Sequence, residues 1–253
     1  MIDLGDKFRL SDDDFDVWLE ELGLLHVYNN EDRDIILELP NIITNINQVK
    51  IVYYYLNILF KCSFEYGYFE EFIFNTKLIE LLFENATTPK QFDVMCSFLM
   101  PFKVYTGRHL LTFVSNYLNS SYLRISFNSV KSYIVEEYID ILLKILMNEG
   151  DKINKIVFLM CSRTPKLFDF IINLIETSRD CSKIVNNIKL EKVYSNFPML
   201  NERAEKIEEQ KTKKRKNRKT EFQLSNKYNS KIKYHIICRG FPHILTVKIK
   251  RIY

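Results

Sequence analysis

The fold assignment depends on the stretch Phe69-Glu70-Glu71-Phe72-Ile73-Phe74-Asn75-Thr76-Lys77-Leu78-Ile79-Glu80-Leu81-Leu82. Its apolar side chains recur at spacings of three and four residues, which places them on one face of an α-helix. The pattern therefore predicts a helix over residues 68–84.

Similar apolar spacing occurs along most of the chain. It predicts further helices over residues 12–22, 31–39, 49–62, 90–100, 108–118, 130–147 and 165–176. The β-branched and aromatic residues of 49–62 also permit a strand, and its length favours the helix. Thr88-Pro89 and Thr164-Pro165 each place a hydroxyl before a proline, which is a typical helix start. With only 6 Gly and 6 Pro, the chain has few turn residues for a many-stranded fold, so we predict a mostly α protein.

Partial repeats appear within these segments. Phe60-Lys61-Cys62-Ser63 leads to Phe72-Ile73-Phe74-Asn75, and Phe158-Leu159-Met160-Cys161-Ser162 leads to Phe170-Ile171-Ile172-Asn173. Residues 69–82, and with them 133–150 and 167–178, resemble the long third helix of armadillo-type repeats. Over about residues 31–180 the chain therefore resembles armadillo and HEAT-type helical-repeat proteins. The resemblance implies a solenoid-like stack of short helices that binds peptides or proteins in a groove. The paired Trp and Asn residues of the nuclear-import receptors are missing, since the single Trp18 lies outside the candidate repeats.

Charge is unevenly distributed. The formal net charge is +4, but residues 211–253 hold 10 Lys and 4 Arg against Glu221 alone, a net +13, which leaves −9 for residues 1–210. A nine-residue basic run, 211–219, follows a polar stretch that begins at Asn201. We interpret residues 201–230 as a basic linker that contacts nucleic acid or a transport receptor, or that is simply solvated.

The C-terminal residues alternate polar and apolar side chains, as half-buried strands do. Residues 231–238 and 245–250 flank the turn residues Arg239-Gly240-Phe241-Pro242-His243. The pattern predicts a small β-hairpin over 231–253, with Ile232, Tyr234, Ile236, Cys238, Leu245, Val247 and Ile249 on one face. Its other face would carry Lys231, Lys233, His235, Lys248 and Lys250. Residues 1–200 would then form the helical domain.

No catalytic or cofactor motif is recognisable. The sequence contains neither a Gly-rich phosphate loop nor a Gly-x-Ser-x-Gly elbow. His235-x-x-Cys238 with His243 could supply three zinc ligands, but a fourth is not evident, so we predict no metal and no cofactor. An enzyme with a diffuse site would be favoured by a cleft that gathers His109 with carboxylates.

Other features bear on compartment and partners. The five cysteines are widely spaced and odd in number, unlike a disulfide framework, and the acidic N-terminus does not resemble a signal peptide. No apolar run approaches the about 20 residues of a membrane span. We therefore expect an intracellular protein, cytoplasmic or nuclear. The acidic cluster Asp12, Asp13, Asp14, Asp16, Glu20 and Glu21 is interpreted as a capped helix start, or alternatively as a site that masks the basic run 211–219.

Together these observations predict a non-enzymatic scaffold that binds a protein through a helical-repeat groove. The alternative is a nucleic-acid or ribonucleoprotein-associated protein that contacts phosphates through its basic C-terminal region. The candidate contacts are Lys211, Lys213, Lys214, Arg215, Lys216, Arg218, Lys219, Lys231, Lys233, Lys248 and Lys250. The second alternative is an enzyme. The oligomeric state is left open.

Overall fold

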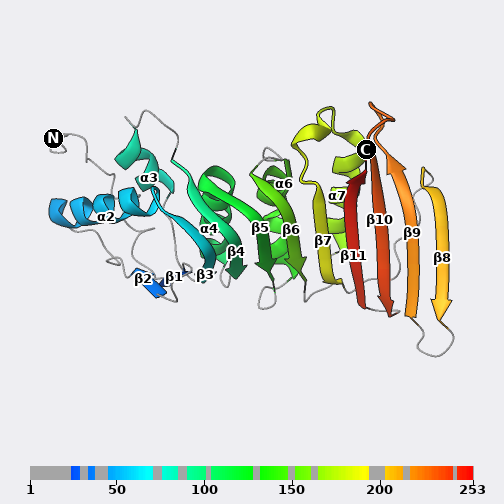
Figure 1. The fold of residues 1–253 in the computed structure, drawn as a ribbon, viewed down its shortest axis with the longest axis horizontal. Helices are drawn as coiled ribbons and strands as arrows, with labels where there is room; N and C mark the ends of the chain where they lie inside the picture. The colour runs from blue at the N-terminus through cyan, green and yellow to red at the C-terminus, as the bar shows by residue number, and fades with distance from the viewer. Residues whose placement is uncertain are drawn as a thin grey trace.

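A computed structural model describes residues 24–28, 34–37, 45–70, 76–84, 90–100, 104–127, 132–147, 152–160, 165–193, 203–212, 217–241 and 244–252. Within these residues the chain forms one sheet of 11 strands, and helices pack against it (Figure 1). The strands are β1 (Leu24–Tyr28), β2 (Asp34–Leu37), β3 (Ser63–Glu70), β4 (Phe92–Met100), β5 (Leu118–Ser126), β6 (Ile153–Leu159), β7 (Asn187–Val193), β8 (Glu205–Thr212), β9 (Asn217–Ser225), β10 (Lys233–Phe241) and β11 (Ile244–Ile252). The helices are α2 (Ile46–Leu59), α3 (Thr76–Phe83), α4 (Val104–Tyr117), α5 (Ser132–Glu137), α6 (Ile139–Met147) and α7 (Pro165–Thr177), with the 3₁₀ turn η1 (Cys181–Lys183).

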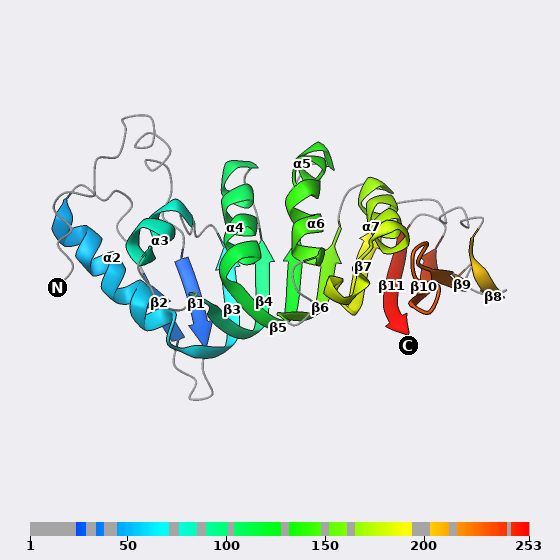
Figure 2. The ribbon, with the colours of Figure 1, turned by 90° about the horizontal axis from the view of Figure 1, so that it is seen from above.

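The strands lie in the order β2-β1-β3-β4-β5-β6-β7-β11-β10-β9-β8. From β3 to β7 each strand is parallel to the next one in the chain, and at least one helix connects each pair. Parallel neighbours require such crossover connections. Seen from above, α3 to α7 all lie on the same side of the sheet (Figure 2). The parallel part is therefore an α/β solenoid, in which each strand–helix unit packs on the next.

One burial pattern repeats in the five parallel strands and the residues just before them. Each buries positions i, i+3 and i+5. The triplets are Phe64, Gly67, Phe69; Val94, Ser97, Leu99; Ser120, Leu123, Ile125; Ile153, Ile156, Phe158; and Val185, Ile188, Leu190. Equivalent positions pair across the sheet, as in Gly67–Ser97–Leu123–Ile156–Ile188. These buried positions are called the inner ladder, and the side of the sheet on which they lie is called the ladder side. This is the L-x-x-L-x-L spacing of leucine-rich repeats, and the first positions, 64, 94, 120, 153 and 185, recur at intervals typical of solenoids.

Aromatic rings fill the core between the first repeats and α4. The Phe69 ring lies 6.0 Å from that of Phe92 and 6.3 Å from that of Phe113 on α4, measured between centroids. Gly67 provides the space for it, because a Cβ there would lie 3.0 Å from the Phe69 ring and 3.0 Å from Val94 Cγ1. The missing side chain in one repeat is thus compensated by a large ring two residues later.

The strands β11, β10, β9 and β8 extend the sheet in antiparallel fashion beyond β7. The predicted hairpin is confirmed, since β10 pairs with β11. Six of the seven residues that we expected on its apolar face are buried: Tyr234, Ile236, Cys238, Leu245, Val247 and Ile249. Their row continues the inner ladder of the solenoid, because Ile249 pairs with Ile188 of β7. The hairpin therefore lies inside the sheet.

Asn226 joins the antiparallel strands to the solenoid. Its side-chain amide donates to the carbonyl oxygens of Ile175 (2.7 Å), Glu176 (3.2 Å) and Ser178 (2.9 Å) at the end of α7. Its Oδ1 accepts from the backbone N–H groups of the β9–β10 turn. The residue is only 1% exposed, so this one side chain satisfies several buried backbone groups at once.

The mostly α prediction is wrong, and so is the resemblance to armadillo and HEAT-type repeats. Residues 90–100 contain β4, residues 31–39 contain β2, and the stretch 68–84 contains the end of β3 and all of α3 rather than one helix. The cause is the i, i+3, i+5 burial, because its three-residue step imitates a helical face in a single sequence. The predicted basic linker is also wrong, since β8 and β9 occupy much of it.

Four helix predictions are confirmed. The predicted helices at 49–62, 108–118, 130–147 and 165–176 correspond to α2, to α4, to α5 with α6, and to α7. Asn45 caps α2, its Oδ1 accepting from the N–H groups of Asn47 and Gln48, and Pro165 opens α7 as expected from Thr164-Pro165. The predicted helix at 12–22 lies outside the described residues.

Candidate functional site

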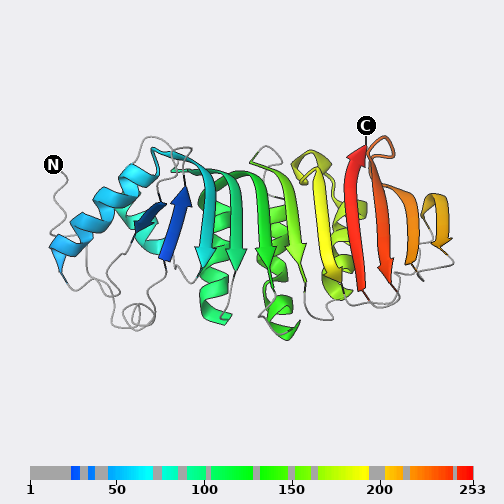
Figure 3. The same ribbon diagram turned by 60° about the horizontal axis from the view of Figure 1, so that its bottom comes forward.

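The side of the sheet opposite α3 to α7 is called here the helix-free face (Figure 3). Side chains alternate between the two faces of a strand, so the residues between the buried ladder positions point to it. Two rows cross it in register. The first row is Tyr66, Cys96, Tyr122, Lys155, Asn187, Lys250, His235 and Gln223; the second is Tyr68, Phe98, Arg124, Val157, Lys189, Lys248, Ile237 and Glu221. The first strands contribute aromatic rings and the later ones charged groups.

Both rows begin with aromatic residues. These residues, Tyr66 and Tyr122 of the first row and Tyr68 and Phe98 of the second, lie on β3, β4 and β5 and are together called the aromatic row. The rings of Tyr68 and Phe98 stack at 4.8 Å with an interplanar angle of 10°. Phe98 and Tyr122 follow at 6.0 Å. Tyr66 and Tyr68 are 38% and 36% exposed, although neighbouring rings are packed to near contact. These are large apolar surfaces that the described helices leave uncovered.

A basic hollow lies beside the aromatic row, over β6, β7, β11 and β10. Its volume is about 400 Å³, and its walls are Asn154, Lys155, Asn187, Ile188, Lys189, His235, Ile237, Lys248, Ile249 and Lys250. In the first row, the short side chain of Asn187 stands between Lys155 and Lys250. The hollow thus combines four ammonium groups, two amides and an imidazole over a floor of strand backbone.

Glu191 forms an ion-pair cluster next to the hollow. It pairs with Arg124 at 3.0 Å and with Lys189. Burial raises the pKa of Glu191, but the hydrogen bond from Lys189 and the positive charges of Lys189 and Arg124 outweigh this and hold the pKa below its ordinary value. Val157 lies between Arg124 and Lys189 in the second row and is 1% exposed.

His235 and Cys238 do not form a metal site. His235 lies on the helix-free face and its Nε2 is 3.2 Å from Glu221, whereas Cys238 is fully buried on the other face. Burial raises the pKa of the Cys238 thiol to about 12. Among the described residues, no cluster of three or more His, Cys, Asp or Glu side chains has the arrangement of a metal site. His243 lies outside those residues.

Of the seven predicted contact residues that the structure describes, two line the hollow, Lys248 and Lys250. Lys233 pairs with Glu205 at 2.8 Å, and Lys219 pairs with Glu221. Lys231 is exposed in the β9–β10 turn, and Arg218 is exposed on β9. Lys211 lies in β8. Lys213, Lys214, Arg215, Lys216 and the acidic cluster at 12–21 lie outside the described part of the chain.

Lys155, Lys189 and the aromatic row are not among the site residues predicted from the sequence. Lys155 and Lys189 lie on parallel strands whose alternation is interrupted by the three-residue step, and Phe98 lies in a strand that we predicted to be a helix. The repeated L-x-x-L-x-L spacing would have been the useful signal. It identifies the strands, and the residues between its positions then identify the helix-free face.

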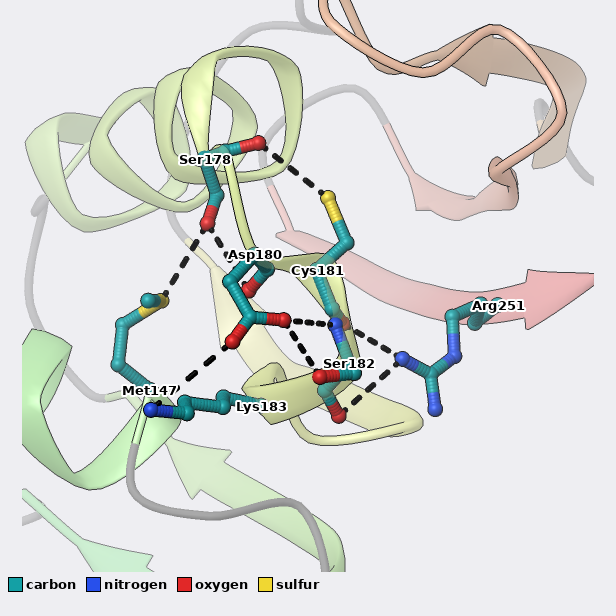
Figure 4. A network of polar contacts seen from close by, with 7 residues as sticks. All are labelled: Met147, Ser178, Asp180, Cys181, Ser182, Lys183 and Arg251. Atoms are coloured by element: carbon teal, nitrogen blue, oxygen red, sulfur yellow. Dashed lines mark hydrogen bonds and ion pairs between the residues drawn. The ribbon is translucent and has the colours of Figure 1, made fainter.

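A second polar cluster attaches β11 to the solenoid (Figure 4). Arg251 donates to the carbonyl oxygens of Cys181 (2.5 Å) and Ser182 (3.4 Å). Asp180 caps the start of η1, where its carboxylate accepts hydrogen bonds from the hydroxyl and the backbone N–H of Ser182. The hydrogen bond from the Ser182 side chain lowers the pKa of Asp180. Burial raises the pKa of the Cys181 thiol, and a thiol of raised pKa is a poor nucleophile. The arrangement is that of a structural clamp.

His109 has a different environment from the one a diffuse catalytic site would need. It is partly buried on α4, and its pKa is lowered, first by burial and then by the positive charge of Lys77. The charged group that acts on this imidazole is therefore a cation. The enzyme alternative gains no support from His109.

Residues 9–128 match a family described as a domain of unknown function, DUF8381, a segment that ends after β5 and so includes the first three parallel strands. No curated protein and no solved structure matches the chain. Within the described residues, none of the helices has the length and apolar character needed to cross a membrane.

Proposed function

We propose that this protein is a non-enzymatic interaction module that binds a partner chain across the helix-free face of its sheet. The observation that carries the proposal is the contrast between the two faces. In the described part of the chain the ladder residues are buried, whereas the described helices leave the stacked aromatic rings and the basic hollow of the other side uncovered. Solenoids use such extended surfaces for binding, and exposed apolar patches mark interaction sites.

The proposed binding site is not the predicted helical-repeat groove, because the fold is a sheet with helices on one side and not a stack of helices. The binding surface proposed instead is the helix-free face of the sheet, where side chains of eight neighbouring strands lie in register rows. Rows of this kind offer an extended partner a regular series of contacts, which suits a peptide or nucleic-acid strand better than a small molecule.

Site-directed photocrosslinking in native extracts tests the proposal. A photoreactive benzoylphenylalanine replaces Phe98 on the helix-free face or, as the matched control, Phe170, which is 40% exposed on α7. We expect discrete adducts from position 98 that excess unlabelled protein suppresses, and none from position 170. Equal adduct patterns from both positions, or no competable adduct from position 98, would refute the proposal.

A further inference from the structure

The cations of the basic hollow are only partly neutralised. Glu191 compensates Lys189, but among the described residues no carboxylate lies within ion-pair distance of Lys155, Lys248 or Lys250. Lys248 also stands directly opposite Lys189 in the β7–β11 pair. Like charges placed directly opposite each other destabilise a sheet. An anion bound in the hollow would remove this repulsion.

The aromatic row continues directly into the hollow. The ammonium group of Lys155 lies 5.2 Å from the centroid of the Tyr122 ring, and Tyr122 follows Phe98 and Tyr68 along the sheet. The aromatic row and the hollow together extend from β3 to β10, which is six strand-to-strand steps. At about 4.8 Å for each step, this surface is about 29 Å long. One continuous surface therefore has aromatic rings at one end and, at the other, three lysines to which the described residues offer no carboxylate partner.

We propose that this surface binds single-stranded nucleic acid, with bases stacked on the aromatic row and phosphates held by Lys155, Lys248 and Lys250. The inference rests on the proposed function and names its ligand. Stacking platforms beside a basic groove are the features that bind single strands without duplex structure. An acidic peptide would use the lysines but would have no use for the stacked rings, and the bases of a duplex are not available for stacking.

The direct test is fluorescence anisotropy of the full-length protein with a fluorescein-labelled 12-nucleotide oligouridylate. We expect saturable binding that weakens with salt, because phosphate contacts release counterions. K248A/K250A should bind about tenfold or more weakly, with a log–log salt slope smaller by about 2, since each phosphate contact contributes about 1. The matched control is K50A/K61A, which removes two exposed lysines at the α2 end of the molecule and should change the affinity less than about twofold.

The aromatic contribution is tested separately by F98A and Y122A. Each should weaken oligonucleotide binding about tenfold, the usual effect of losing one stacking ring, without changing the salt slope. Unfolding in urea confirms that the variants fold. This pair of readouts separates stacking from a purely electrostatic attraction, which would leave F98A and Y122A unaffected.

Several outcomes would overturn the inference. They are equal binding by K248A/K250A and K50A/K61A, tighter binding of a 12-base-pair duplex, and preference for a labelled poly-glutamate peptide over the oligonucleotide. Absence of oligonucleotide binding would also overturn it. If competable adducts at position 98 persisted in that case, the proposed function would stand with a protein as the partner; if they were absent too, both would fall.

Discussion

The parallel strands β3–β7 and the antiparallel strands β11–β8 share one inner ladder but are covered differently. In the parallel half each strand from β3 to β6 is followed in the chain by at least one helix on the inner side of the sheet. In the antiparallel half strand follows strand, and Asn226 ties the β9–β10 turn to the last helix. The parallel half therefore supplies the helices that cover it, whereas the antiparallel half contributes no described helix and is attached to the last helix of the parallel half.

The difference indicates that the antiparallel half is the C-terminal cap of the solenoid. A stack of repeats ends in an open strand edge, which must be capped to prevent association. β11 pairs with the edge of β7, and the outermost strand, β8, carries Lys206, Glu208 and Glu209, the kind of charges that protect an edge. The basic hollow lies across the joint, since β6 and β7 supply one wall and β11 and β10 the other.

The largest expected effect is on the ladder itself. Phe158 of β6 is fully buried and Phe222 of β9 is 4% exposed. Phe158→Ala should cost about 3–5 kcal/mol of unfolding free energy, as is typical of a phenylalanine removed from a packed core. Phe222→Ala should reduce the unfolding free energy by less, because no described helix connects the strands of the cap and the backbone around the cavity can relax more easily. Urea unfolding measures both, and equal losses would show that the two halves are covered equally well.

The junction should be the next most sensitive point. Asn226→Ala removes a side-chain donor from three carbonyl groups at the end of α7 and the acceptor of two turn N–H groups. The Glu176 carbonyl keeps the N–H of Lys227, and the Ser178 carbonyl keeps the thiol of Cys181. We expect a loss of about 2–3 kcal/mol, since each buried polar group left unsatisfied costs about 1–3 kcal/mol. Hydrogen exchange of β9 and β10 should accelerate more than that of β4 and β5. The exposed Asn229 of the same turn is the control, and Asn229→Ala should change stability by about 0.5 kcal/mol or less. A uniform increase in exchange would mean that the halves unfold as one unit.

How far the sequence predicts the fold depends on which half is considered. In the cap the alternation is clean from Tyr234 to Cys238, and it predicts the hairpin and six of the seven residues assigned to its buried face. In the solenoid the step from Val94 to Ser97 breaks the two-residue period. Read alone, that step has helical spacing, and only the comparison of all five repeats identifies it as a strand.

The candidate site shows the same dependence. Lys248 and Lys250 were predicted because they alternate with buried residues of β11, whereas Lys155 comes from a strand that was not predicted. Which lysines remain uncompensated depends on neighbours distant in the chain, such as Glu205 for Lys233. No local pattern contains that information, so a basic run at 211–219 appeared more important than two lysines near the C-terminus.

A smaller effect is expected inside the ladder of the solenoid, where two repeats place serine instead of an apolar residue. Ser120 and Ser97 are 2% and 0% exposed, and their hydroxyl oxygens lie 3.0 Å apart. Ser120→Ala should cost about 1–2 kcal/mol, because it leaves the Ser97 hydroxyl with one partner fewer in the core. The double variant Ser97→Ala with Ser120→Ala should be less destabilised than the sum of the two single variants, since it removes both polar groups. Additive losses in urea unfolding would show that the two hydroxyls do not depend on each other.

The smallest expected effect concerns the ion-pair cluster beside the hollow. The pKa of Glu191 is held below its ordinary value of 4.5, so its ion pairs with Arg124 and Lys189 stabilise the fold fully above that pH and lose their contribution as the pH falls through the lowered pKa. Glu191→Gln should therefore reduce the unfolding free energy by about 1 kcal/mol or less at pH 7, and the difference from wild type should shrink below pH 4.5. Glu209→Gln on the exposed edge strand is the control and should show little difference at either pH. A difference that grew on acidification would mean that Glu191 is destabilised by burial rather than stabilised by its cations.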